Sequence, residues 1–297
     1  MIRNKKHGKS RYEVLMEYVF LFCAFIAVIS IFAITFFVFV KGLQPFMPWS
    51  KDQYSLFQFL SGIEWRPGLN MYGILYMIAG SILATFGAIL LGVPIGLFTA
   101  VFIAEVAPKS IANIVRPAVE LLAGIPSVLY GIFGLGVIVR FLKDYSPYAT
   151  GQSLLATIFV LTVMILPTVI SMSETAIRAV PESYKHGSLA LGASKTQTIF
   201  KIMIPAAKSG ILAGVVLGIG RAIGETMAVM LVCGNPIAGL PFSLWDRIRP
   251  LTTNIALEMG YAVGLHQDLL FSTGVALFVF IMVINFVLNK LIHKSVK

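Results

Sequence analysis

The chain has 297 residues, of which 58% are apolar and only 12% are charged. A soluble domain has roughly 25% charged residues, so this chain has too few charges for a water-facing surface and much of it must face lipid. The net charge of +10 is spread over short segments beside apolar runs, with no basic stripe interleaved with aromatic residues. The charge therefore suits an anionic membrane face and gives no reason to expect a nucleic-acid partner.

Six apolar runs are each long enough to cross a membrane as a helix, which takes about 20 residues. The second run, 67–104, is too short for two spans with a loop, so one helix over about 72–103, bent near Pro94, is expected there. The predicted spans are, in chain order, 18–40, one helix within 67–104, 121–139, one helix within 145–173, 209–232 and 269–289.

The first run is longer than the apolar part of a signal peptide, which has roughly 7–15 residues, and no clear cleavage site follows it. It is therefore expected to stay as an uncleaved membrane helix. The layout predicts an all-α integral membrane protein with six transmembrane helices. Its parts are a basic tail 1–17, a first helix 18–40, an outer loop 41–71, a core 72–291 with five helices and an inner loop 172–208, and a tail 292–297.

The distribution of lysine and arginine predicts the orientation, because these residues accumulate on the cytoplasmic side. With the N-terminus inside, the inner segments hold 15 Lys/Arg and the outer loops hold 7. Both termini are therefore expected in the cytoplasm. Trp49, Trp65 and Trp245 all fall in the outer loops, where tryptophan is expected as an anchor at the membrane interface.

Motifs for cofactors and metals do not stand out in the sequence. The two cysteines and four histidines are scattered, which predicts neither a disulfide framework nor a metal site. Gly187 and Gly192 have the spacing of a phosphate-binding loop, but Lys195 does not directly follow the second glycine and no strand precedes the first. We expect no cofactor and no ATP on this chain, so any energy source would be another chain or an ion gradient.

The inner loop 172–208 is the most informative segment. Pro181 can open a short helix and Gly192 can close it, with Tyr184 and Leu189 supplying apolar side chains between them. A second amphipathic stretch, 195–204, precedes Pro205. These features predict a rigid helical knob on the cytoplasmic face; an interfacial loop lying on lipid is the alternative.

This loop resembles the coupling loop of ABC importer permeases. Their signature is Glu-Ala-Ala, three residues, Gly, nine residues and Ile-x-Leu-Pro, and the chain matches it at Gly192, Ile202 and Pro205. At 186–188, His-Gly-Ser stands in place of Glu-Ala-Ala. Residues 121–131 and 218–229 are similar to the phosphate-uptake permeases, and the layout resembles the PstC family more than the PstA family.

The resemblance implies a type I, MetI-like permease of the bacterial cell membrane. It also implies a PstA-like second permease, a PstB-like ATPase dimer that binds the ATP, and a PstS-like extracytoplasmic protein that delivers phosphate. The residues that it assigns to coupling with the ATPase are Pro181, Tyr184, His186, Gly187, Leu189, Gly192, Ile202 and Pro205.

Arg221 and Glu225 are opposite charges four residues apart in the fifth predicted span. Each costs roughly 2.5–3.5 kcal/mol at the centre of a membrane helix, so each needs a partner or a water-lined face. Gly210, Gly214 and Gly218 precede them, and the five positions fall within an arc of roughly 80° on one helix. Small residues at this spacing let a neighbouring helix approach closely.

Two interpretations of this pair stay open. The two charges can form a buried pair that only fixes helix packing. Alternatively, Arg221 supplies positive potential to an anion pathway, and Glu225 orients it and limits how tightly the anion is held. The resemblance to phosphate permeases favours the second interpretation.

The sequence thus predicts a permease subunit of an ATP-driven phosphate importer, which is not itself an enzyme. A permease for another oxyanion, sulfate or molybdate, is an alternative. An ion-coupled secondary transporter would not need a coupling loop, and a membrane-embedded enzyme would need a converging catalytic set, which the sequence does not offer.

Overall fold

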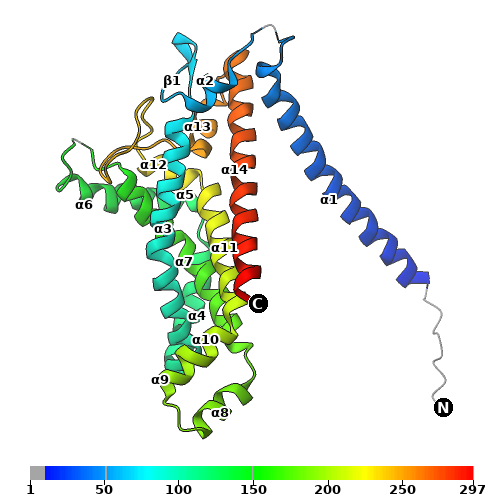
Figure 1. The fold of residues 1–297 in the computed structure, drawn as a ribbon, viewed down its shortest axis with the longest axis vertical. Helices are drawn as coiled ribbons and strands as arrows, with labels where there is room; N and C mark the ends of the chain where they lie inside the picture. Colours follow the sequence, from blue (N-terminus) through cyan, green and yellow to red (C-terminus); the bar gives the residue numbers. More distant parts are fainter. Residues whose placement is uncertain (1–10, 51, 149, 297) are drawn as a thin grey trace.

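The computed structural model describes residues 11–50, 52–148 and 150–296, which are mostly helical (Figure 1). Within these ranges, four helices are long and apolar enough to cross a membrane, and two bent helix pairs bring the number to six if each pair is one span. The four long helices are α1 (Arg11–Leu43), α3 (Leu75–Val101), α7 (Leu154–Arg178) and α14 (Leu265–Val296).

The centre of the bundle is built by α3 and α7, which lie side by side along most of their length (Figure 1). Glycines on α3 allow this close approach: a Cβ at Gly87 would lie 2.4 Å from the side chain of Ile158, and one at Gly92 would lie 2.6 Å from that of Ile165. Helices in lipid gain most of their association energy from such packing, because apolar surface is not driven out of lipid. The prediction of one long second span is confirmed, since Pro94 lies inside α3 without ending it.

The prediction of one continuous helix for the third span, 121–139, is wrong. The chain forms α4 (Lys109–Gly124) and then a second helical run that begins with α5 (Ser127–Phe133), bent by 98° from the first. Ile125 is extended, with φ −69° and ψ 129°, because Pro126 disfavours the helical conformation of the residue before it. The second run continues through a π-helical turn, Gly134–Val139, into α6 (Arg140–Lys143).

The fifth predicted span is also interrupted. α11 (Lys208–Gly224) ends before Glu225, whose backbone is extended at φ −70° and ψ 128°, and α12 (Met227–Val232) follows. The continuous helix predicted over 209–232 is therefore two helices. Before α11, a helical run over 195–206 meets it at an angle of 69°.

Following the predicted orientation, we call the end of the molecule that carries the loop 41–71 the outer end, and the end that carries α8 (Glu182–Ala190) the inner end. The loop 41–71 has secondary structure of its own. It contains α2 (Leu56–Ser61) and a small antiparallel hairpin of β1 (Trp65–Arg66) and β2 (Met71–Tyr72). Together with α13 (Leu251–Glu258), these elements cover the upper end of the bundle in Figure 1. The expectation that Trp65 anchors the membrane interface is wrong, because its side chain is fully buried in this cap.

The first helix stands apart from the bundle and leans away from it below its outer end (Figure 1). It touches α14 at Gly42, where a Cβ would lie 2.8 Å from the backbone of Phe271, and Ser272 Oγ donates a 2.7 Å hydrogen bond to the Gly42 carbonyl. α1 covers residues 11–17, the described part of the predicted basic tail. Its first turn and the end of α14 both point towards the end of the molecule that carries α8 (Figure 1).

Candidate coupling helix and translocation surface

The short helix predicted between Pro181 and Gly192 is present as α8 (Glu182–Ala190). Pro181 is its N-cap residue, and Gly192 follows its end with φ +85°. Glycine suits this left-handed position because a side chain would strain it. α8 projects from the bundle at the lower end of Figure 1, as expected of a knob that meets another protein.

The surface of α8 carries the residues assigned to coupling. None of its residues, all of which the structure describes, is buried. Tyr184 and Leu189 are exposed, and Leu191, just after the helix, is 90% exposed. His186 lies 3.8 Å from Glu182 on the same exposed face, and a Cβ at Gly187 would meet no other described atom within 4 Å. Exposed apolar side chains gathered on one knob are typical of a protein interaction site.

The second amphipathic stretch is helical in three parts. They are α9 (Lys195–Thr198), a π-helical turn (Ile199–Met203) and α10 (Ile204–Ala206). Ser194 and Gln197 form a capping box that starts this run. Ile202 is exposed, and Pro205 lies in the first turn of α10, next to the bend that leads into α11.

Polar contacts tie α8 to the bundle. Lys185 Nζ lies 2.6 Å from Glu105 Oε2, in the π-helical turn Phe102–Val106 that ends α3. The hydroxyls of Ser188 and Thr198 lie 3.0 Å apart and join α8 to α9. Lys185 and Glu105 are 80 positions apart in the sequence, so sequence reasoning gave no signal for this contact.

A second ion-pair cluster lies at the end of α7 that precedes α8. The sequence analysis did not predict this cluster either. The buried carboxylate of Glu174 on α7 accepts hydrogen bonds from Arg116 on α4, with Nε at 3.0 Å, and from Arg178, with Nε at 2.8 Å. Arg178 Nη2 also donates to the carbonyl oxygen of Ile103 at 2.9 Å. The four-residue spacing of Glu174 and Arg178 was visible in the sequence as a helical ion pair.

The glycine stripe of α11 faces α7. A Cβ at Gly210 would lie 2.5 Å from Cβ of Ala176, and one at Gly214 would lie 2.7 Å from Cβ of Met172. At Gly218 the contact is looser, 3.2 Å from a methyl group of Val169. The three glycines thus let the backbones of α11 and α7 approach closely.

Arg221 and Glu225 do not share one helix face, because α11 ends at Gly224. In the described part of the chain, no ion pair joins them. Glu225 Oε1 instead accepts a 3.1 Å hydrogen bond from the backbone N–H of Ala228, at the start of α12. The prediction that the two charges lie on one face of a single helix is therefore wrong, although they are four residues apart in the sequence. Glu225 caps the second half of a broken helix, and Arg221 is left half-buried near the end of the first half.

The helix after the first break, α5, packs on the helix after the second break, α12. A Cβ at Gly131 on α5 would lie 2.8 Å from Cα of Ala228 on α12. Next to this contact, the hydroxyl of Tyr130 donates a 2.5 Å hydrogen bond across the first break to the carbonyl oxygen of Leu122. We call the face of α11 that carries Leu217, Gly220, Arg221 and Gly224 the open face.

The open face has little cover from the chain itself. Leu217 is 54% exposed, and a Cβ at Gly220 or Gly224 would have no neighbour within 4 Å among the described residues. The four positions fall within an arc of about 100° on the helix. A half-buried cation on a membrane helix face that the chain leaves uncovered needs water or another protein beside it.

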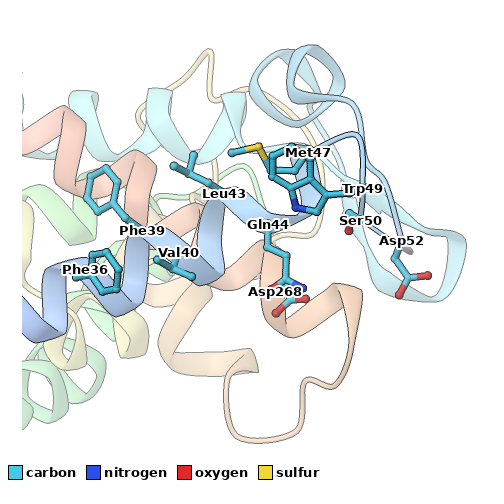
Figure 2. Close-up of a pocket in the computed structure, with 10 residues that line it drawn as sticks. All are labelled: Phe36, Phe39, Val40, Leu43, Gln44, Met47, Trp49, Ser50, Asp52 and Asp268. Carbon is cyan, nitrogen blue, oxygen red and sulfur yellow. The ribbon is translucent and has the colours of Figure 1, made fainter.

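A hollow of about 760 Å³ lies between the outer end of α1 and the start of α14, and no residue of the open face lines it (Figure 2). Phe36, Phe39 and Val40 form its apolar part, and the carboxylates of Asp52 and Asp268 lie at its outer end (Figure 2). Two carboxylates make the hollow unsuitable for an anion. The open face with Arg221 is the better candidate for an anion path.

Comparison with known proteins identifies the family. The model of the family "Binding-protein-dependent transport system inner membrane component" matches residues 92–297, more than half of the chain. The chain belongs to this family. It is a multi-pass protein of the bacterial inner membrane and a transport component rather than a catalytic subunit.

Several curated relatives of this permease match over most of its length. The probable ABC transporter permease protein YqgH of Bacillus subtilis is 41% identical over 276 residues, which covers 90% of this chain and 88% of the relative. The phosphate transport system permease protein PstC of Pasteurella multocida is 31% identical over 288 residues, 90% of each chain. PstC of Mesorhizobium japonicum is 35% identical over 253 residues, 78% of this chain and 76% of the relative.

Solved structures confirm the permease fold. A chain of a bacterial alginate ABC transporter, crystallised with its alginate-bound periplasmic protein, matches 97% of this permease and 99% of its own length, with a TM-score of 0.66 and 17% identity. A chain of the methionine ABC transporter MetNI matches 75% of this permease and 98% of its own length, with a TM-score of 0.60 and 20% identity. The predicted all-α, MetI-like permease architecture is confirmed.

Proposed function

We propose that this permease is the PstC-like subunit of an ATP-driven phosphate importer. A PstA-like second permease would complete the translocation path, and a PstB-like ATPase dimer would bind the ATP. A PstS-like extracytoplasmic binding protein would deliver phosphate. The family, whose transport depends on a binding protein, and the relatives that carry phosphate transport in their names support this assignment.

The observation that carries the phosphate path is the position of Arg221. Arg221 is half-buried on the open face, where the chain leaves Gly220 and Gly224 uncovered. A second permease set against this face would enclose the cation in a path between the two subunits. Arginine suits phosphate because its planar donors match the oxygens of the anion. Glu225 lies nearby, and its negative charge would keep the anion from being held too tightly.

Coupling to ATP hydrolysis would use α8. The knob would sit in a groove of the ATPase dimer, with Tyr184, Leu189 and Leu191 as the apolar contacts. Closure of the dimer would then move α8 and the helices tied to it as a rigid body. Because His186 stands where the family signature has glutamate, the contact is expected to rely on apolar packing more than on a salt bridge from this position.

Phosphate uptake by an Arg221→Gln variant tests the path. We expect uptake of labelled phosphate by cells to fall to background, while membrane insertion and assembly with the partner subunits stay normal. Arg140→Gln is the matched control, because Arg140 is an exposed arginine on α6. Normal uptake by Arg221→Gln would refute the role of Arg221.

The identity of the anion is tested in the same cells. Labelled phosphate, sulfate and molybdate are compared with and without this permease. Loss of phosphate uptake alone is expected on deletion. Loss of sulfate or molybdate uptake with unchanged phosphate uptake would favour the alternative oxyanion.

The docking role of α8 is tested by a bulky substitution. Leu189→Trp or Gly192→Trp is expected to uncouple ATP hydrolysis from transport in the reconstituted importer. Ile114→Trp is the control, because Ile114 is an exposed apolar residue of α4. Unchanged coupling in both α8 variants would mean that α8 is not the docking element.

A further inference from the structure

A series of polar contacts at the inner end of the permease runs from the coupling helix to α4, with one step along the backbone between Glu105 and Ile103. Lys185 on α8 pairs with Glu105 at the end of α3, with 2.6 Å between Nζ and Oε2. Two residues before Glu105, the carbonyl oxygen of Ile103 accepts the hydrogen bond from Arg178. Arg178 and Arg116 share Oε1 of Glu174. We call these contacts the ion-pair relay.

The relay joins four elements that form two pairs of sequence neighbours, the π-helical turn Phe102–Val106 with α4, and α7 with α8. It starts on α8, passes through the π-helical turn that ends α3, continues to the inner end of α7 and finishes on α4. The two carboxylates at its nodes are well shielded, since the side chains of Glu105 and Glu174 are each 7% exposed. A shielded carboxylate keeps its geometry better than a surface pair, because water competes less for its oxygens.

Polar contacts matter for α8 because apolar packing does not hold it. None of the residues of α8, which lies wholly in the described part of the chain, is buried. Among the described residues, the side-chain hydrogen bonds that join it to the π-helical turn after α3 and to α9 are Lys185 with Glu105 and Ser188 with Thr198. Lys185 therefore links α8 to the end of α3, in addition to the covalent link of α8 to α7 through residues 179–181.

The far end of the relay lies on the helix that leads to the first break. Arg116 is on α4, which ends at Gly124, just before Pro126. Leu122, near the end of α4, receives the hydrogen bond from Tyr130 beside the contact of α5 with α12. A shift of α4 would therefore move the junction of the two broken helices, next to the helix that carries Arg221.

We propose that Lys185, Glu105, Arg178, Glu174 and Arg116 transmit the motion of the coupling helix to α4 and so to the translocation surface. Lys185 is a positioning residue that acts through Glu105, and it touches neither the cargo nor ATP. The relay deepens the proposed function and rests on it for the docking of α8. It does not depend on phosphate being the cargo.

The matched test uses two lysines of the same inner region. The whole importer is reconstituted in lipid vesicles, and the number of ATP molecules hydrolysed per anion imported is measured. Lys185→Met is expected to raise this ratio about tenfold, within the range typical of a coupling free energy between sites. Lys195→Met is the control, because Lys195 is an exposed lysine at the start of α9 and lies outside the relay.

Charge exchange separates transmission from simple stabilisation. Glu105→Lys alone is expected to uncouple the importer, and the double variant Lys185→Glu with Glu105→Lys is expected to restore coupling to within about threefold of the parent. A purely structural role predicts a lower melting temperature in Lys185→Met with an unchanged ratio of ATP to anion. That result would overturn the relay.

Two further outcomes distinguish the relay from the proposed function. If Lys185→Met no longer binds the ATPase, Lys185 is a docking contact and the relay is wrong. If the parent importer moves another anion with tight coupling and Lys185→Met loses that coupling, the relay stands and phosphate as the cargo is wrong.

Discussion

Each end of this permease has a buried carboxylate held by cations, but the two ends differ in how far water reaches them. At the outer end, Glu258 on α13 accepts a 2.6 Å hydrogen bond from Trp65 Nε1, pairs with Arg249, and lies 2.7 Å from His266 Nε2. The Arg249 side chain is only 4% exposed. At the inner end, the side chains of the two arginines that hold Glu174 are 41% and 44% exposed.

The elements that carry these clusters differ in the same way. α13 buries five of its residues, including Glu258, whereas α8, all of which is described, buries none. Breaking a buried pair leaves an uncompensated charge and is strongly destabilising. Exposed cations that lose their partner are solvated instead, at a cost of roughly 0–1 kcal/mol. The outer end is thus built as a fixed cap, whereas loss of the ion pairs at the inner end costs little stability.

The largest effect is expected at the outer cluster. Glu258→Gln leaves the positive charge of Arg249 buried without a counter-charge, which should lower the free energy of unfolding by about 3–5 kcal/mol. Chemical denaturation of the purified protein in detergent measures this change. Glu64→Gln is the control, because the pair of Glu64 with Arg66 is largely exposed, at 33% and 43%. Equal stability of the two variants would show that the buried pair at Glu258 stabilises the fold no more than an exposed pair does.

A smaller loss of stability is expected at the inner cluster. Glu174→Gln should lower the free energy of unfolding by about 1 kcal/mol, because Arg116 and Arg178 can turn to water. The same denaturation experiment measures it. Transport by Glu174→Gln should nevertheless fall more than transport by Glu258→Gln, when each rate is divided by the amount of folded protein. The reverse order would contradict the assignment of motion to the inner end.

A local effect is expected at the end of the coupling helix. Gly192→Ala forces a side chain into a left-handed conformation, which costs about 1 kcal/mol. Because α8 is not packed in the core, hydrogen exchange of its amides should speed up with little change in global melting. Gly187→Ala is the matched control: it lies inside the helix and should slow the exchange. Faster exchange in both variants would show that the turn conformation is not the cause.

The smallest effect is expected in the outer loop after α12. Burial would raise the pKa of Asp246, but hydrogen bonds from Tyr148 and from the backbone N–H groups of Ser243 and Phe242 hold this pKa below its usual value. A lowered pKa means that the stabilisation is present above the unfolded value, about 3.9, and is lost as the pH falls through the folded value.

Tyr148→Phe removes one of these hydrogen bonds and should raise the pKa of Asp246. The loop should then loosen at a higher pH than in the parent, which hydrogen exchange across the acidic range can measure. A loop that loosens at the same pH in both proteins would show that Tyr148 does not set the titration of Asp246.

Local chemistry let the sequence predict several particular features. The low charge and the long apolar runs predicted a helical membrane protein, and α1, α3, α7 and α14 are those runs. Pro181 and Gly192 marked the two ends of α8 because the capping rules depend on a few adjacent residues. Pro126 also carried the signal for the first break, since proline restricts the residue before it. The prediction of one span over 121–139 used only the length of the apolar run.

The tertiary structure alone decided which distant residues meet. The place of Trp65 in a predicted outer loop suggested a residue at the membrane interface. The fold instead buries it against Glu258, 193 positions away. Arg116 and Glu174 are 58 positions apart, and their pairing depends on how α4 lies against α7. The break at Glu225 likewise follows from contacts of α12 with α5 and from the hydrogen bond of Thr252 to the Glu225 carbonyl.

The sequence by itself determined the membrane class, the long helices and the knob, because each depends on residues within one or two helical turns or on the cost of charge in lipid. The tertiary structure decided the broken spans, the buried outer cap and the ion-pair relay, because a buried charge takes its partner from whichever helix packs beside it.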